Sequence, residues 1–189
     1  MTKTNFALAI SLMIVTFMLG LVGGYFVSPT YQQNMYIKSE GMGLGKADRY
    51  VDLRYVNAMI AHHNGAILLA NQISDKTERA DIKHLTAEIQ VGEPKAIAEL
   101  YQWKKSWYND VSQVENPLVA NLGTKDEKTD LRFLNALIAH HQSGIEMTKE
   151  IRAKSSRKEV LDNADAVEAF LTNGVVMLKG WRKDLYGVE

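Results

Sequence analysis

Apolar side chains recur at intervals of three and four residues through most of the chain after residue 47, the spacing of helices that each bury one face. Between residues 52 and 73 this face consists of Tyr55, Val56, Met59, Ile60, His62, His63, Ala66, Ile67, Leu69, Ala70 and Ile73. Together with glycine, proline and helix-starting residues, the pattern predicts four helices, at residues 48–74, 77–108, 125–153 and 157–185.

Three of these helices are expected to begin at capping boxes, in which the first and fourth side chains each satisfy a free backbone donor. The boxes are Asp75 to Glu78, Thr124 to Glu127 and Ser156 to Glu159. The second helix contains Pro94, which lacks a backbone N–H and crowds the preceding turn. We therefore expect a kink or a break in that helix.

The helical part of the chain is an internal duplication. The sequence DLRYVNAMIAHHNGAILLANQI (52–73) aligns without a gap on DLRFLNALIAHHQSGIEMTKEI (130–151), with 11 identities in 22 positions at an offset of 78. The same offset places Trp103 on Trp181 and Tyr108 on Tyr186, so the repeat units are 52–108 and 130–186. Two helical hairpins with one apolar face each predict an all-α four-helix bundle with a pseudo-twofold axis over residues 48–187.

The first 28 residues predict a membrane anchor or a signal peptide. Residues 6–27 carry no charge, and a bilayer core requires about 20 apolar residues. The apolar run is longer than a usual signal core and no A-x-A sequence follows it, which favours an uncleaved span. Lys3 precedes the span, which predicts a single-pass cell-membrane protein whose C-terminal domain is extracytoplasmic, periplasmic or extracellular. Residues 29–47, with Pro29 and three glycines, are expected to be a flexible tether.

Composition limits the partners. The 22 basic and 22 acidic residues cancel, and this balance argues against a nucleic-acid partner. The absence of cysteine excludes disulfides and thiolate metal ligands. Gly20 and Gly24 in the apolar run form a G-x-x-x-G motif, which would permit a homodimer within the membrane.

Two adjacent histidine pairs stand on the buried faces, His62 with His63 and His140 with His141. Neighbours on a helix diverge by about 100°, so one pair cannot chelate a single ion as His-x-x-x-His does. Across the pseudo-twofold axis, however, the two pairs would face each other and supply four imidazoles, the number that a tetrahedral site requires.

Two methionines lie near the histidine pairs. Met59 stands one turn before the first pair, and Met147 stands two turns beyond His140 on nearly the same face. Imidazole with thioether suits Cu(I) or Ag(I) better than magnesium or calcium. The alternative is a structural or interaction bundle whose histidines form a buried hydrogen-bonded network or a pH sensor.

Catalytic signatures are absent from the sequence. It contains no Glu-x-x-His pair for a di-iron site, no His-Glu-x-x-His, no nucleophile elbow and no phosphate loop. His84 has no counterpart in the second repeat unit and is expected to form a salt bridge on a helix face. We therefore expect a protein that is not an enzyme, although a metal-dependent oxidase stays an alternative.

The repeated sequences MIAHHNGAI (59–67) and LIAHHQSGIEM (137–147) resemble the bacterial family "domain of unknown function 305", whose signature is close to M-I-x-H-H-x-x-A-I-x-M. The resemblance covers residues 49–187 in two copies and implies a ferritin-like bundle and an exported copper-binding protein that sequesters or hands on the metal. The implied ligands are His62, His63, His140, His141, Met59, Glu146 and Met147. Copper is the implied ion, with silver or zinc as alternatives.

The sequence departs from that signature at several methionine positions. Leu68 and Leu69 stand where the pattern favours Glu and Met, and Leu137 stands where it favours Met. Leu100 and Leu178 also occupy positions where Met is common. These departures leave weak copper binding, another metal or no metal as outcomes.

Overall fold

The computed structural model describes residues 43–188, which contain helices α3 (Val51–Ile73), α4 (Ala80–Tyr108), α5 (Thr129–Arg152) and α6 (Lys158–Tyr186) and no strand. All four predicted helices are confirmed, although α3, α4 and α5 begin three or four residues later than expected. The predicted membrane span at residues 6–27 and the Gly20–Gly24 motif lie outside the described residues. Among the described helices, none has the length and apolar character needed to cross a bilayer.

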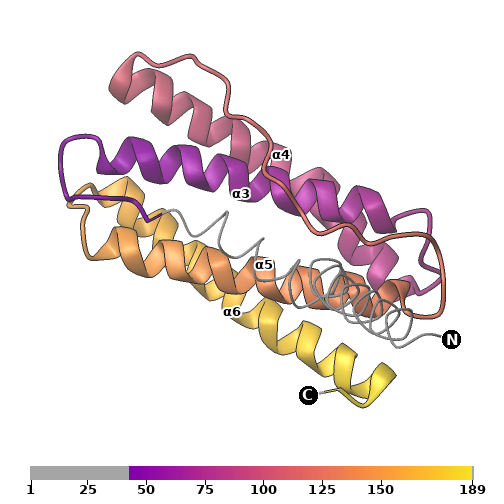
Figure 1. Ribbon diagram of the computed structural model, residues 1–189. Coiled ribbons are helices and arrows are strands. Elements are labelled where there is room, and N and C mark those ends of the chain that lie inside the picture. Colours follow the sequence, from indigo (N-terminus) through magenta and orange to yellow (C-terminus); the bar gives the residue numbers. More distant parts are fainter. Residues whose placement is uncertain (1–42, 189) are drawn as a thin grey trace, which may run out of the picture.

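Helices α3 and α5 lie antiparallel at the centre of the molecule, and each is covered by the second helix of its own hairpin (Figure 1). Helix α4 packs on α3, α6 packs on α5, and the two hairpins meet mainly through α3 and α5. The structure therefore confirms the all-α bundle of two helical hairpins. The link between the hairpins returns along α3 to reach the start of α5 (Figure 1).

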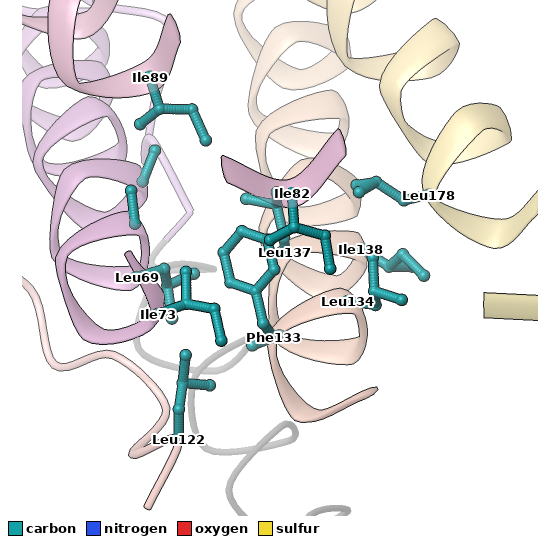
Figure 2. Close-up of a cluster of buried hydrophobic side chains, with 13 residues drawn as sticks. Leu69, Ile73, Ile82, Ile89, Leu122, Phe133, Leu134, Leu137, Ile138 and Leu178 are labelled. Carbon is teal, nitrogen blue, oxygen red and sulfur yellow. The ribbon is translucent and has the colours of Figure 1, made fainter. Parts of the chain in front are cut away.

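Two apolar clusters form the core, one towards each end of the α3–α5 pair. The first, shown in Figure 2, includes Leu69 and Ile73 of α3 and Phe133, Leu134, Leu137 and Ile138 of α5. The second combines the N-terminal half of α3, from Val51 to Ile60, with Met147 and Ile151 of α5. On both helices the histidine pairs stand between these two clusters, so the bundle has a polar layer between two apolar ones.

The segments that lead into α3 and α5 are duplicated as well. Arg54 Nε donates to the carbonyl of Leu44 at 2.5 Å, and Arg132 Nε donates to the carbonyl of Leu122 at 2.6 Å. Gly45 and Gly123 share the left-handed conformation, with φ of 71° and 69°, which glycine adopts without steric cost. The repeat therefore begins at residue 44, and residues 43–47 of the predicted tether belong to the folded domain.

Each of these leader segments, which precede α3 and α5, is hydrogen-bonded to a side chain of the other copy. The backbone N–H of Leu44 donates to Glu150 Oε1 on α5 at 2.7 Å. The backbone N–H of Leu122 donates to Gln72 Oε1 on α3 at 2.9 Å. The side chains of Leu44 and Leu122 are 2% and 1% exposed. Leu44 packs in the second apolar cluster and Leu122 packs in the first. These two equivalent hydrogen bonds, Leu44 to Glu150 and Leu122 to Gln72, join the hairpins at both ends of the α3–α5 pair, and we call them clamps.

The predicted capping boxes are wrong. The N-cap residues are Arg79, Lys128 and Arg157, and none makes a side-chain capping bond. Instead, a polar side chain two residues earlier accepts a hydrogen bond from the backbone N–H of each N-cap residue. The acceptors are Thr77 Oγ1 at 3.2 Å, Asp126 Oδ1 at 2.8 Å and Ser155 Oγ at 3.1 Å. Because these turns come first, α4 and α5 start later than the boxes imply.

Helix α4 continues through Pro94 to Tyr108, so the expected break is absent. Proline removes one backbone hydrogen bond and crowds the preceding turn. Pro94 and its neighbour Gly92 lie on the exposed side of the helix, and a Cβ at Gly92 would meet no atom within 4 Å. Water can therefore solvate the carbonyl that proline leaves without a donor.

Candidate metal centre

The inner histidine of each pair faces its counterpart across the α3–α5 interface. His62 and His140 stack with their ring centroids 3.8 Å apart and their planes inclined by 21°. His62 Nε2 donates to the backbone carbonyl of His140 over 3.1 Å. The two side chains are 3% and 1% exposed, so the predicted meeting across the core is confirmed for His62 and His140.

The second histidine of each pair turns away from the first, as the helical geometry predicts. The His62 and His63 rings are 6.1 Å apart and inclined by 82°, and the His140 and His141 rings are 6.1 Å apart and inclined by 62°. His63 and His141 therefore each point towards the second helix of their own hairpin, α4 and α6 respectively.

The two outer histidines have different surroundings. His63 Nδ1 is hydrogen-bonded to Glu93 Oε2 on α4. His141 lies instead against Gly174 of α6, where an added Cβ would fall 2.6 Å from its Nε2. The Phe170 ring, 6.4 Å from the His141 ring, lies on the solvent side and is 65% exposed. The chemistry of the site is therefore less symmetric than its backbone.

Glu93 is a site residue that the sequence reasoning missed. The repeat offset places it opposite Leu171, which is buried. A carboxylate aligned with a buried leucine is a signal that Glu93 points inwards, and this signal could have been found in the alignment of the two copies.

Burial keeps two of the imidazoles neutral. Desolvation lowers the pKa of His140 to about 3, and the nearby His63 adds to the effect. Desolvation likewise lowers the pKa of His141 to about 3, with a further contribution from His140 and an opposing one from Glu93. Neither ring is protonated between pH 5 and 8, which argues against a pH sensor built on these two residues.

A groove of about 460 Å³ opens onto the histidine layer. All four histidines line it, with Glu93, Ala66, Ile89 and Leu171 among the surrounding side chains. Gly144 makes room for this arrangement, because a Cβ there would lie 2.5 Å from His62 Nε2 and 2.4 Å from Leu171 Cδ1. The lack of a side chain at Gly144 therefore permits His62 and Leu171 to pack closely against α5.

The two predicted methionines lie together on one side of the histidine layer. Met59 and Met147 are both buried in the same apolar cluster, whereas their repeat counterparts, Leu137 and Leu69, lie in the other one. The two predicted thioethers therefore lie on the same side of the histidine layer. Glu146 is not part of this arrangement, since it lies on the exposed face of α5 and pairs with Lys149 at 2.9 Å.

The donor types at this site fit a soft metal ion. Imidazoles with neighbouring thioethers suit Cu(I) and Ag(I), and His63 Nε2 is a buried ring nitrogen with no hydrogen-bond partner among the described residues. Within residues 43–188, no three His, Asp or Glu side chains stand close enough together to hold one ion in their present conformations.

The sequence comparison identifies the family. The family model "Domain of unknown function (DUF305)" matches residues 52–130 and again residues 130–189. The chain belongs to the DUF305 family. Its two matched segments correspond to the two copies of the repeat, so this protein is a tandem DUF305 chain. No curated protein matches the sequence.

Solved structures share the fold at low sequence identity. "CopM in the Cu(I)-bound form" is 23% identical, with a TM-score of 0.64 over 71% of this chain and 97% of that chain. "CopM in the apo form" is 24% identical, with a TM-score of 0.63 over 71% and 98%. A DUF305 fragment from Deinococcus radiodurans is 20% identical, with a TM-score of 0.61 over 71% and 96%. The tandem DUF305 chain thus has the same bundle fold as these proteins.

Proposed function

We propose that this protein binds Cu(I) or Ag(I) at the histidine layer between α3 and α5, and that it sequesters the ion or hands it on without catalytic turnover. The bundle would do so on the extracytoplasmic side of a membrane, attached through residues 6–27. The observation that carries the proposal is that four imidazoles from two helices line one groove. The buried thioethers of Met59 and Met147 in the adjoining cluster add the soft donors that these ions prefer.

The protonation state of the site supports metal binding at neutral pH. A metal-binding imidazole must be deprotonated, and rings that carry a proton must first release it. His140 and His141, with pKa values of about 3, are already neutral, so they lose no proton to the ion. CopM, which shares the fold, has been solved with Cu(I), Cu(II) and Ag bound, which supports the choice of metal.

One rearrangement is required of the stacked pair. His62 Nε2 donates to the carbonyl of His140, so the lone pair of the His62 ring is on Nδ1. Because the His62 and His140 rings are stacked, one of them must rotate before both can direct a nitrogen at the same ion. We therefore expect metal binding to separate these two rings.

Metal titration of the purified full-length chain tests the proposal. Cu(I), Ag(I), Cu(II) and Zn(II) are titrated in competition with a chromophoric chelator, and tight binding of Cu(I) and Ag(I) is expected. Two double variants, H62A/H140A and H63A/H141A, should weaken that binding. The matched control is H84A, which removes an exposed histidine that pairs with Glu88 outside the layer. Affinity weaker than millimolar, or affinity unchanged in both double variants, would contradict the proposal.

A further inference from the structure

The two halves of the site differ at one buried contact. In the first copy, Glu93 accepts a hydrogen bond from His63. In the second copy, Leu171 occupies the position that corresponds to Glu93, so His141 has no such carboxylate. Glu93 and His63 are only 17% and 12% exposed, so this pair is shielded from water while His84 and Glu88 on α4 are 74% and 65% exposed.

The contact determines which nitrogen of His63 is available. A carboxylate accepts hydrogen bonds and has no proton to donate in its ionised form, so Nδ1 must carry the hydrogen. The lone pair of a neutral His63 ring is then on Nε2. This atom is buried and has no hydrogen-bond partner among the described residues, and the His63 side chain lines the groove with the other three histidines.

We infer that Glu93 is a positioning residue, which fixes the tautomer and orientation of His63 so that Nε2 is presented to a metal ion in the groove. This inference rests on the proposed function. Metal-binding histidines usually donate their second ring N–H to a carboxylate or carbonyl, which fixes the ring and raises its basicity. Because only the first copy has this carboxylate, the two halves are not equivalent and His63 is the better ligand of the two outer histidines.

Three variants separate positioning from simple packing. E93L introduces the residue found at the equivalent position of the second copy and removes the acceptor. E93Q retains a neutral acceptor of nearly the same shape. E99Q is the control, because Glu99 is an exposed carboxylate on the same helix that is not among the residues lining the groove. Loss of such an orienting partner typically weakens metal affinity about 10- to 100-fold.

The test measures Ag(I) affinity and the His63 tautomer separately on the full-length chain. Ag(I) affinity should fall about 10- to 100-fold in E93L, fall less in E93Q and stay within twofold of wild type in E99Q. Long-range proton–nitrogen NMR of the metal-free wild type should show His63 with its proton on Nδ1, and E93L should lose that preference.

Different results would overturn the two proposals. A wild-type chain that binds no Ag(I) would contradict the proposed function, whatever the tautomer. Tight Ag(I) binding that is unchanged in E93L would overturn only the role of Glu93. If E93L fails to fold, the wild-type tautomer decides: a proton on Nε2 of His63 would overturn the inference, as would an E93Q variant that binds Ag(I) no more weakly than E99Q.

Discussion

Space for the His62 ring exists because residue 144 has no side chain. A Cβ at Gly144 would fall 2.5 Å from His62 Nε2 and 2.4 Å from Leu171 Cδ1, both well inside van der Waals contact. The histidine layer thus depends on a glycine in the middle of α5, although glycine usually weakens a helix by about 0.5–1 kcal/mol relative to alanine.

We predict that G144A destabilises the metal-free protein by about 1–3 kcal/mol, the usual cost of overpacking a filled core. The control is G180A, because Gly180 is exposed on α6 and a Cβ there meets no atom within 4 Å. G180A should stabilise the protein by up to about 1 kcal/mol through helix propensity. Urea denaturation monitored by circular dichroism measures both, and equal effects of the two substitutions would contradict the close packing at Gly144.

Buried neutral histidines also predict how stability depends on pH. The folded-state pKa of His140 and of His141 is about 3, below the value of about 6.5 in an unfolded chain. The unfolded chain therefore takes up protons first as the pH falls. The contribution of the two neutral rings to the free energy of unfolding is complete well above pH 6.5. It declines as the pH falls from 6.5 to 3, by up to about 1.4 kcal/mol per pH unit for each ring.

Urea denaturation of the metal-free protein at pH 7.5, 6.5 and 5.5 measures this dependence. Most carboxylates titrate at lower pH, so the histidines dominate this window. We expect a small loss of stability between pH 7.5 and 6.5 and a larger loss between pH 6.5 and 5.5. The loss should be smaller in H141Q, which keeps a polar side chain of similar size but cannot take up a proton. Identical stability at all three pH values would contradict the buried neutral state.

At the scale of the helices, the periodic pattern predicted what lies inside the bundle better than where each helix starts. Apolar spacing identified α3 to α6 because the buried face of a helix must be apolar along its length. The starts depend on single hydrogen bonds. Thr77, Asp126 and Ser155 accept from the backbone N–H groups of Arg79, Lys128 and Arg157, and these turns replace the predicted capping boxes. Which polar side chain accepts such a bond is decided by the turn geometry, which the sequence pattern does not contain.

The leader segments carry a repeat signal that their glycine content obscures. Leu44-Gly45 and Leu122-Gly123 are identical at the repeat offset, and Asp48 matches Asp126. These identities extend the repeat to residue 44. The composition of the segment, with several glycines, led instead to the prediction of a tether up to residue 47.

Leu122 should therefore behave as a core residue although it lies in the link between hairpins. We predict that L122A costs about 2–5 kcal/mol, since the side chain is 1% exposed in the first apolar cluster (Figure 2). L118A, in the same link but 75% exposed, should change stability by no more than about 0.5 kcal/mol. Thermal denaturation compares the two variants, and a similar small effect of both would contradict the role of the leader.

For the whole molecule, the duplication predicted both the architecture and the meeting of the histidine pairs. Two equivalent hairpins can bury their apolar faces only against each other, and a twofold arrangement then brings equivalent residues such as His62 and His140 together. The symmetry argument by itself does not identify Glu93, which only one copy has; the signal for Glu93 is the mismatch with Leu171 when the two copies are aligned. Symmetry also could not show that Glu146 faces the solvent, since that residue was taken from the family resemblance alone.

The mutual burial of α3 and α5 predicts that neither hairpin is a folded monomer by itself. Expressed separately, residues 1–114 and 115–189 should remain unfolded or pair with copies of themselves, because each exposes the apolar face that the other covers. Expressed together, they should assemble one to one, since the Leu122–Gln72 clamp and the two apolar clusters span the cut. Size-exclusion chromatography with circular dichroism distinguishes these outcomes, and a cooperatively folded single hairpin would contradict the prediction.

The two clamps, Leu44 to Glu150 and Leu122 to Gln72, are equivalent to each other, as the two copies of a contact are in a symmetric dimer, but here both lie within one chain. In a dimer of identical hairpins, every substitution at the interface appears twice, so a carboxylate introduced beside one histidine is introduced beside both. Joining two hairpins in one gene removes that restriction. Glu93 beside His63 and leucine at position 171 are differences of the kind that only a joined pair can acquire. After such a fusion, the residues on the two sides of the histidine layer are encoded separately and can change independently.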